Sequence, residues 1–233
     1  MKTIGLIGGM SWESSIEYYR LINEYVKERL GGLHSCQCLM YSVDFAEIEV
    51  LQHQGRWEEL GVVLAEAARR VEQGGADFVL ICTNTMHKVA DAVVARVGIP
   101  LLHIADATAE EIKRQGLDRV GLLGTRFTME QDFYKNKLDE HGIRVIVPNQ
   151  GDIEVIHAVI YDELVVGKIS DISREKVTTI MSKLASQGAQ GIVLGCTELP
   201  LLVRQTDSRL PLFNTMLLHA SQAVDRALGT GPV

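Results

Sequence analysis

Two nine-residue stretches decide the fold of this chain: Gly75-Ala-Asp-Phe-Val-Leu-Ile-Cys-Thr83 and Gly188-Ala-Gln-Gly-Ile-Val-Leu-Gly-Cys196. Each is an apolar run of strand length that begins at a glycine and ends at a hydroxyl or thiol side chain. They align without a gap at an offset of 113 residues. An internal repeat of this kind predicts two structurally similar halves.

Two further pairs of segments repeat in the same order along the chain. Ile4–Gly9 matches Val120–Thr125, and Ile99–His103 matches Leu210–Asn214. The spacing between partners stays close to that of the first pair, so two α/β halves fit better than one long sheet. Because each half is small, we expect a pocket at the interface between them.

Short runs rich in Val, Ile and Leu alternate with stretches of helical periodicity along the whole chain, which predicts parallel sheets covered by helices. The expected strands are Thr3–Ile7, Gln37–Val43, Phe78–Ile81, Leu101–His103, Arg119–Leu123, Val145–Val147, Ile192–Leu194 and Leu212–Phe213. The clearest expected helices are Ser14–Arg29, Arg56–Glu72, Met129–His141 and Ser173–Gln187. We expect one α/β domain from residues 1–98 plus 210–233 and a second from residues 99–209.

The composition excludes several classes of function. The 233 residues carry a formal charge of −7 and no long basic run, so we expect no nucleic-acid partner. The longest apolar runs, such as Phe78–Cys82, are far shorter than the roughly 20 residues of a membrane helix. The first residues lack a signal-peptide pattern, and four cysteines are too few for a disulfide scaffold. We therefore expect a cytoplasmic protein with reduced thiols, no membrane association and no metal site.

The turn after the first expected strand reads Gly8-Gly9-Met10-Ser11. Its glycines allow a tight turn, and Ser11 can cap the next helix, whose N-terminus favours an anion. A plain helix cap is one alternative. Dinucleotide binding is another, supported by Asp44, but the spacing Gly5-x-x-Gly8-Gly9 is not the fingerprint G-x-G-x-x-G. The counterpart in the second half is Gly124-Thr125.

The ends of the repeated strands carry the groups suited to chemistry, because ligands of open parallel sheets bind beyond the carboxyl ends of the strands. Cys82-Thr83-Asn84-Thr85-Met86-His87 follows one strand, and Cys196-Thr197-Glu198 follows its repeat. Small polar side chains and helix-start amides suit an amino-acid carboxylate, and a thiol suits proton transfer. The alternative is that a buried cysteine only fills space.

With these motifs the chain resembles the aspartate/glutamate racemase family over essentially its whole length. The matching pieces are Gly8-Gly9-Met10-Ser11, Asn84-Thr85-Met86-His87 and Gly195-Cys196-Thr197-Glu198. The resemblance implies two Rossmann-like domains with parallel sheets, related by a pseudo-two-fold axis, with the active site in the inter-domain cleft. It also implies a homodimer that racemises a small amino-acid substrate without pyridoxal phosphate or any other cofactor. Within the family, the chain is similar to bacterial members described as specific for L-aspartate and L-glutamate or as having broad specificity.

The first-half motif departs from the family pattern Cys-Asn-Thr-x-His. Threonine occupies the expected thiol position as Thr83, and Cys82 lies one residue early. The internal repeat also pairs Thr83 with Cys196. Successive strand side chains point to opposite faces, so Cys82 is expected in the core if Thr83 faces the cleft. The predicted catalytic pair is therefore Thr83 and Cys196, with Cys82 as the alternative partner.

The remaining site residues follow from the same resemblance. The expected substrate contacts are Met10, Gln52, Asn84, Thr85, Thr125 and Thr197, and the expected supporting residues are Ser11, Cys82, His87 and Glu198. Acidic-substrate members carry an arginine after the second strand, but none occurs between Tyr41 and Gln54, and Val165 replaces a family lysine. These differences weaken the case for strict aspartate specificity.

The chemistry expected of these groups is Cα deprotonation by a Cys196 thiolate, most readily on the L-enantiomer, and reprotonation of the opposite face by Thr83 or a water that it holds. A helix start after Cys196 is expected to lower the pKa of its thiol. Two roles stay open for His87, proton shuttle and structural support. Two also stay open for Glu198, which could orient the thiol or simply start a helix. Cys36 and Cys38 are expected to be packing residues.

Two other functions fit a single cleft cysteine. An arylmalonate decarboxylase-like enzyme needs only one thiol to protonate an enediolate. A non-catalytic amino-acid-binding protein would carry a relict thiol. The Asn84-Thr85-Met86-His87 string and the resemblance over the whole chain favour the racemase.

Overall fold

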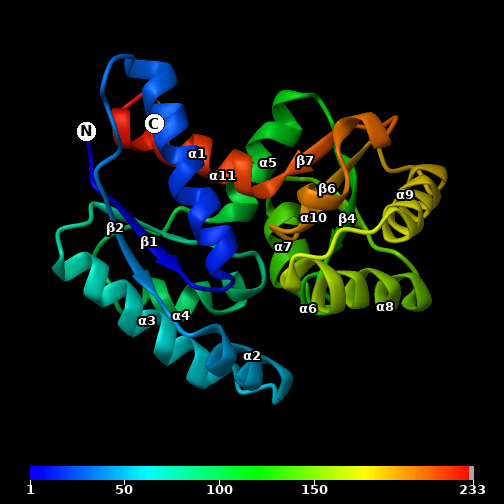
Figure 1. Ribbon diagram of the computed structural model, residues 1–233, viewed down its shortest axis with the longest axis horizontal. Helices are drawn as coiled ribbons and strands as arrows, with labels where there is room; N and C mark the ends of the chain where they lie inside the picture. The colour runs from blue at the N-terminus through cyan, green and yellow to red at the C-terminus, as the bar shows by residue number, and fades with distance from the viewer. Residues whose placement is uncertain (231–233) are drawn as a thin grey trace. The chain divides into compact units, whose positions relative to one another are not determined.

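The computed structural model describes residues 1–230, which form two compact units (Figure 1). Unit 1 comprises Met1–Ile104 and the described residues from Met216 onward, and unit 2 comprises Ala105–Thr215. Each unit contains one parallel sheet with helices, which confirms the expected α/β class.

The sheet of unit 1 has the strand order β2-β1-β3, with all neighbours parallel. β1 spans Ile4–Gly8, β2 spans Cys38–Ser42 and β3 spans Phe78–Ile81. β1 and β3 are buried along their full length, whereas β2 is partly exposed, as an edge strand is. Beyond β3, Leu101 forms a single parallel bridge with Val79.

Alternating side chains of this sheet build two separate cores, as the two-residue period of a strand requires. Ile4, Leu6, Phe78 and Leu80 pack on one face with α1 (Trp12–Leu30) and α11 (Thr215–Leu228), which lie side by side (Figure 1). The opposite face packs against α3 (Trp57–Gln73). The other helical segments of the unit are α2 (Phe45–His53), η1 (Thr85–Val89) and α4 (Ala90–Val94).

The sheet of unit 2 has the order β5-β4-β6-β7, again with all neighbours parallel. Its strands are β4 (Arg119–Gly124), β5 (Arg144–Ile146), β6 (Gly191–Gly195) and β7 (Leu212–Asn214). One face packs against α8 (Gln150–Ala158) and α9 (Asp171–Ser186) in a shared apolar core. The other helical segments are α5 (Ile104–Arg114), α6 (Arg126–Glu130), α7 (Asp132–Glu140), the π-helical turn η2 (Val159–Glu163), η3 (Leu164–Val166), α10 (Leu199–Leu202) and η4 (Gln205–Asp207).

The two sheets have the same topology, which explains the sequence repeat. β1 and β4 each lie between the next strand along the chain and the repeated strand, β3 or β6. The segments at Leu101 and Leu212 then pair with β3 and β6 respectively, at repeat-related positions. The expected strand at Leu101–His103 forms only this one bridge, whereas β7 pairs over three residues.

The helix that follows each of these two segments belongs almost entirely to the other unit. α5, after Leu101, lies in unit 2 except for Ile104, and α11, after β7, lies in unit 1 except for Thr215. The unit boundaries therefore fall at residues 104 and 215, six residues beyond the expected 98 and 209. The physical reason is strand pairing, since Leu101 pairs with β3 and β7 pairs with β6 before the chain leaves each sheet.

Candidate active site

The turn at the end of β1 is held by a small network of serines. Gly9 has a φ of +94°, and a Cβ built there would lie 2.2 Å from the carbonyl oxygen of Val43, so only glycine fits. The Ser15 hydroxyl accepts the Gly9 N–H at 2.7 Å and donates to the Ser11 carbonyl at 2.8 Å. Ser11 caps α1, as predicted, and Met10 is buried in the core beneath α3.

The end of β3 separates Cys82 from Thr83. Cys82 is fully buried in the core shared with α1 and α11, and this burial raises the pKa of its thiol. Thr83 is partly exposed. The alternation expected at this strand end is therefore present, with Cys82 in the core and Thr83 partly exposed.

His87 holds the backbone around Thr83. Its Nδ1 lies 2.8 Å from the carbonyl oxygen of Thr83, and its Nε2 accepts the N–H of Ile104 at 3.2 Å. A carbonyl only accepts and an amide only donates, so Nδ1 carries the proton of a neutral imidazole. Burial lowers the pKa of His87 to about 4. Both nitrogens are engaged by backbone groups, so this side chain supports Thr83 and is not placed to shuttle a proton.

Gln52, on α2, is 3% exposed and lies beside η1. Its Nε2 donates to the Met86 sulfur at 3.0 Å, while its buried Oε1 has no hydrogen-bond partner in the described structure. A buried amide oxygen without a donor is costly. Asn84 and Thr85, at the start of η1, are also buried.

The end of β6 brings a thiol and a hydroxyl to one buried carboxylate. The Cys196 thiol donates to Oε2 of Glu198 at 3.0 Å, and the Thr197 hydroxyl donates to the same oxygen at 2.8 Å. All three side chains are buried. Glu198 therefore does more than precede α10: its carboxylate orients the thiol.

The expectation of a lowered pKa at Cys196 is wrong in sign. Backbone N–H groups of Glu198 and Leu199 do lower it, as a helix start should, but desolvation by burial raises it more. The negative charge of Glu198 and its hydrogen bond raise it further. In this state Cys196 carries its proton and the pKa of the thiol lies well above its ordinary value.

The turn after β4 matches the turn after β1 in chemistry. Thr125 caps α6 by accepting the N–H of Thr128 at 3.3 Å, and the two hydroxyls are 3.2 Å apart. A Cβ at Gly124 would meet the carbonyl oxygen of Gly195 at 2.8 Å, so β4 and β6 approach closely here.

The predicted residues are divided between the two units. The group of unit 1 contains Met10, Ser11, Gln52, Cys82, Thr83, Asn84, Thr85 and His87, and that of unit 2 contains Thr125, Cys196, Thr197 and Glu198. Ser15 was not among the predicted site residues, although its position four residues after Ser11 was the available signal. His219 is a buried core residue that accepts from the Tyr18 hydroxyl at 2.8 Å and donates to the Leu102 carbonyl at 2.9 Å.

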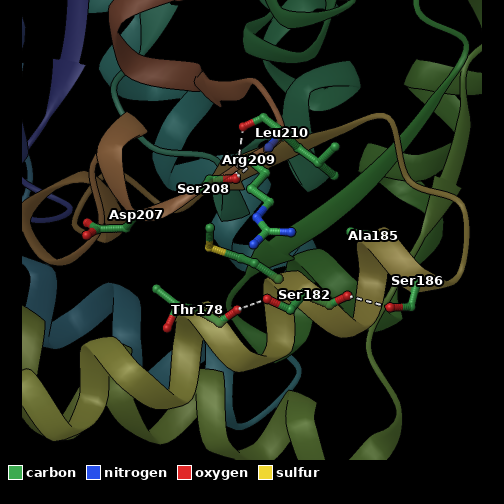
Figure 2. Close-up of a pocket in the computed structure, with 9 residues that line it drawn as sticks. Thr178, Ser182, Ala185, Ser186, Asp207, Ser208, Arg209 and Leu210 are labelled. Atoms are coloured by element: carbon green, nitrogen blue, oxygen red, sulfur yellow. Dashed lines mark hydrogen bonds between the residues drawn. The ribbon is translucent and has the colours of Figure 1, made fainter.

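A separate pocket of about 470 Å³ lies in unit 2 between α9 and residues 207–210 (Figure 2). None of the predicted site residues lines it. The hydroxyls of Ser182 and Ser186 donate to carbonyls of their own helix. The charged side chains that line the pocket are those of Asp207 and Arg209, both labelled in Figure 2. The pocket is therefore distinct from the unit 2 group around Cys196.

Across residues 1–230, no group of three or more His, Cys, Asp or Glu side chains is arranged to hold a metal ion. Among the described helices, none combines the length and apolar character needed to span a membrane.

Comparisons with known proteins agree with this architecture. Residues 7–223 match the family model described as Asp/Glu/Hydantoin racemase. A crystal structure of a proposed Asp/Glu racemase from Yersinia pestis is 55% identical, with a TM-score of 0.93 over 98% of this chain and all of that one. An aspartate racemase homologue from Pyrococcus horikoshii is 36% identical, with a TM-score of 0.86 over 98% of this chain and 100% of that chain.

A relative from Bacillus subtilis is named a broad specificity amino-acid racemase, RacX. It is 23% identical over 97% of this chain and 98% of its own length. The expected family and the expected class of enzyme are both confirmed, because the relatives named by these comparisons are racemases. The chain belongs to the Asp/Glu/hydantoin racemase family and is an isomerase.

Proposed function

We propose that this protein is a cofactor-independent amino-acid racemase that acts on aspartate and glutamate or on a broader set of amino acids. The observation that carries the proposal is the Cys196 thiol, which lies at a strand end and donates to the buried carboxylate of Glu198. The names of the relatives support racemisation of an amino acid.

Cys196 and Glu198 together supply the base for the first proton transfer. The thiol proton moves to Oε2 of Glu198, and the resulting thiolate takes the Cα proton of the L-amino acid. The N–H groups of Glu198 and Leu199 hydrogen-bond to the sulfur and would stabilise the negative charge of the thiolate once it forms.

Thr83 supplies the second proton transfer, on the opposite face of the carbanion. Its hydroxyl, or a water that it holds, gives a proton to Cα and recovers one from solvent. A hydroxyl is far less acidic than a thiol, so Thr83 is a poor base for the reverse direction. We therefore expect slower turnover of the D-enantiomer, although equilibrium remains racemic.

The substrate contacts in this proposal are Met10, Gln52, Asn84, Thr85, Thr125 and Thr197. The unpaired Oε1 of Gln52 accepts a hydrogen bond, so it favours a substrate or water that brings a donor. No arginine follows β2 before Gln52, and the relative from Bacillus subtilis is named broad-specificity. Both observations support a substrate range wider than aspartate.

Proton NMR in D2O with L-glutamate, L-aspartate and several neutral and basic amino acids tests the proposal. We expect the Cα proton to exchange without net loss of substrate. Cys196→Ser should abolish exchange, and Cys36→Ser should retain it. Loss of CO2 from an arylmalonate without exchange of any amino acid would refute the racemase assignment, and binding without either reaction would indicate a non-catalytic protein.

Thr83→Cys tests the pairing of the two groups. A second thiol should leave the L-reaction intact and speed the D-reaction, because it is a better base than a hydroxyl. Initial rates measured separately on each enantiomer give the answer. If the variant folds normally but loses both reactions, Thr83 does not act opposite Cys196, and Cys82 becomes the partner to test.

We also propose that the protein works as a homodimer in the cytoplasm, on the strength of its family resemblance. Light scattering on the purified chain tests the oligomeric state.

A further inference from the structure

The pocket between α9 and residues 207–210 is a cavity that the proposed racemase chemistry does not use (Figure 2). Its volume of about 470 Å³ lies within the range of roughly 300–1,000 Å³ that is typical of small-molecule sites. All of its lining residues belong to unit 2, so the pocket is complete within one compact unit.

The loop that forms one wall of the pocket is held in place by the side chain of Gln205. Its Oε1 accepts the N–H of Leu212 at 2.9 Å, and its Nε2 donates to the Leu210 carbonyl at 3.0 Å. The Ser208 hydroxyl donates to the same carbonyl at 2.9 Å. The backbone on both sides of Arg209 is therefore fixed, which limits the ordering cost of binding a ligand there.

Arg209 supplies the positive charge of the pocket, and Figure 2 shows its side chain extending from the loop towards α9. Its guanidinium forms no hydrogen bond or ion pair with any residue in the described range 1–230. The other charged lining group, the Asp207 carboxylate, instead accepts the N–H of Arg204 at 2.8 Å. A guanidinium presents its N–H donors in a planar fork that matches a carboxylate. The pocket therefore offers a place for an anionic head group.

Apolar side chains complete the lining of the pocket. Met181 is 3% exposed and belongs to the core of unit 2, and Ala185 and Leu210 are partly buried. The hydroxyls of Ser182 and Ser186 donate within α9, so they provide no donor for an anion while those bonds persist. A ligand held at Arg209 can thus bury an aliphatic chain beside its head group, and each buried CH2 group improves affinity up to about fourfold.

We propose that this pocket binds a short-chain carboxylate, with the head group on Arg209 and the chain against Met181, Ala185 and Leu210. The site is separate from the residues assigned to racemisation and does not depend on the proposed function. An anion without a chain engages only the arginine, whereas a chain of several carbons also removes apolar surface from water.

NMR of the full chain, labelled with carbon-13 at the methionine methyl groups, tests the proposal with hexanoate as the probe. The Met181 methyl group reports on the pocket, and Met181→Leu identifies its signal. Met129, in the core of the same unit, does not line the pocket, and Met10 reports separately on the racemase site. We expect the Met181 signal to shift saturably, with a dissociation constant of about 1 mM, while the Met129 signal stays in place.

Three variants test the role of the arginine and of the cavity. Arg209→Gln removes the charge and should weaken hexanoate binding at least about tenfold, and Arg209→Lys, which keeps the charge without the fork, should weaken it less. Arg144→Gln is the matched control, since Arg144 is an exposed arginine of unit 2 that does not line the pocket. Ser182→Phe places a ring in the pocket from an exposed position on α9 and should abolish binding.

Two further probes separate the head group from the chain. Hexylammonium has the same chain with the opposite charge, and inorganic phosphate has the charge without the chain. We expect both to bind at Met181 at least about tenfold more weakly than hexanoate. The proposal is overturned if Met181 does not respond to hexanoate, or if Arg209→Gln binds hexanoate as tightly as the wild type. Phosphate that binds as tightly as hexanoate overturns the assigned class of ligand.

Discussion

At the scale of single residues, the central feature is the carboxylate placed against the proposed catalytic thiol. Glu198 raises the pKa of Cys196 through its charge and its hydrogen bond, in addition to the larger effect of burial. Glu198→Gln removes the charge and offers an N–H to the sulfur, so we predict a lower thiol pKa and faster alkylation of Cys196 near neutral pH. Each unit of decrease raises the thiolate fraction about tenfold.

The measurement is the rate of Cys196 alkylation against pH, followed by mass analysis of its peptide. Racemase activity should fall in the same variant, because the amide cannot accept the thiol proton. Glu163→Gln is a matched control, since Glu163 accepts from Ser173 in the same unit and does not contact Cys196. An unchanged or higher pKa in Glu198→Gln would contradict the role assigned to the carboxylate.

Residues in strands were more predictable than contacts between side chains. The placement of Cys82 in the core beside a partly exposed Thr83 follows from strand alternation, a property of the backbone. The thiol–carboxylate contact at Cys196 depends on side-chain rotamers and burial, which no sequence pattern encodes. The sign of the Cys196 pKa shift was therefore mispredicted from the helix start alone.

At the scale of elements, the turn between β1 and α1 depends on Gly9. Gly9→Ala introduces a Cβ 2.2 Å from the backbone oxygen of Val43, in addition to an unfavourable positive φ. Gly31, with a φ of +71° and no atom within 4 Å of its added Cβ, separates these effects. Because Gly31 has a ψ of −169°, in a region that essentially only glycine adopts, we predict that Gly31→Ala costs about 1–3 kcal/mol of unfolding free energy. Gly9→Ala should cost clearly more, because the steric clash is added.

Urea unfolding of both variants and the wild type measures this difference. The backbone carbonyl of Val43 cannot rotate away as a side chain can, so Gly9→Ala should also move the turn and raise KM for the substrate. Equal losses of stability in the two variants would mean that the turn relaxes around the methyl group.

Seven of the eight expected strands are present within one or two residues of their expected bounds. The apolar runs of β1, β3, β4 and β6 fit buried parallel strands, which is why pattern alone located them. Leu101–His103 forms only an isolated bridge, although its sequence resembles that of β7. The difference is one of pairing across the sheet, which a local pattern does not report.

At the scale of the whole molecule, the two units share a topology but differ in their buried titratable groups. Unit 1 contains His87 and His219, both fully buried and neutral, and the nearby His87 further lowers the pKa of His219, to about 3. The two histidines of unit 2, His141 and His157, are partly exposed. Lowering the pH should therefore destabilise unit 1 before unit 2.

The direction in which stability changes with pH follows from proton linkage. The pKa of His87 is about 4 in the folded protein against 6.5 ordinarily, so the unfolded chain binds more protons between these values. The stability that depends on a neutral His87 is complete above pH 6.5 and is lost as the pH falls towards 4. Acidification from pH 7 to pH 5 should cost about 2 kcal/mol through His87 alone.

Thermal unfolding at pH 7 and pH 5, with hydrogen exchange to locate the first segments to open, measures this loss. In His87→Gln the amide can still donate to the Thr83 carbonyl and accept from Ile104, but it does not titrate, so the loss of stability between the two pH values should shrink. His157→Gln, in unit 2, should leave that loss unchanged. If His87→Gln keeps the full wild-type loss, or if unit 2 opens first in acid, the buried histidines of unit 1 do not set the acid sensitivity of the protein.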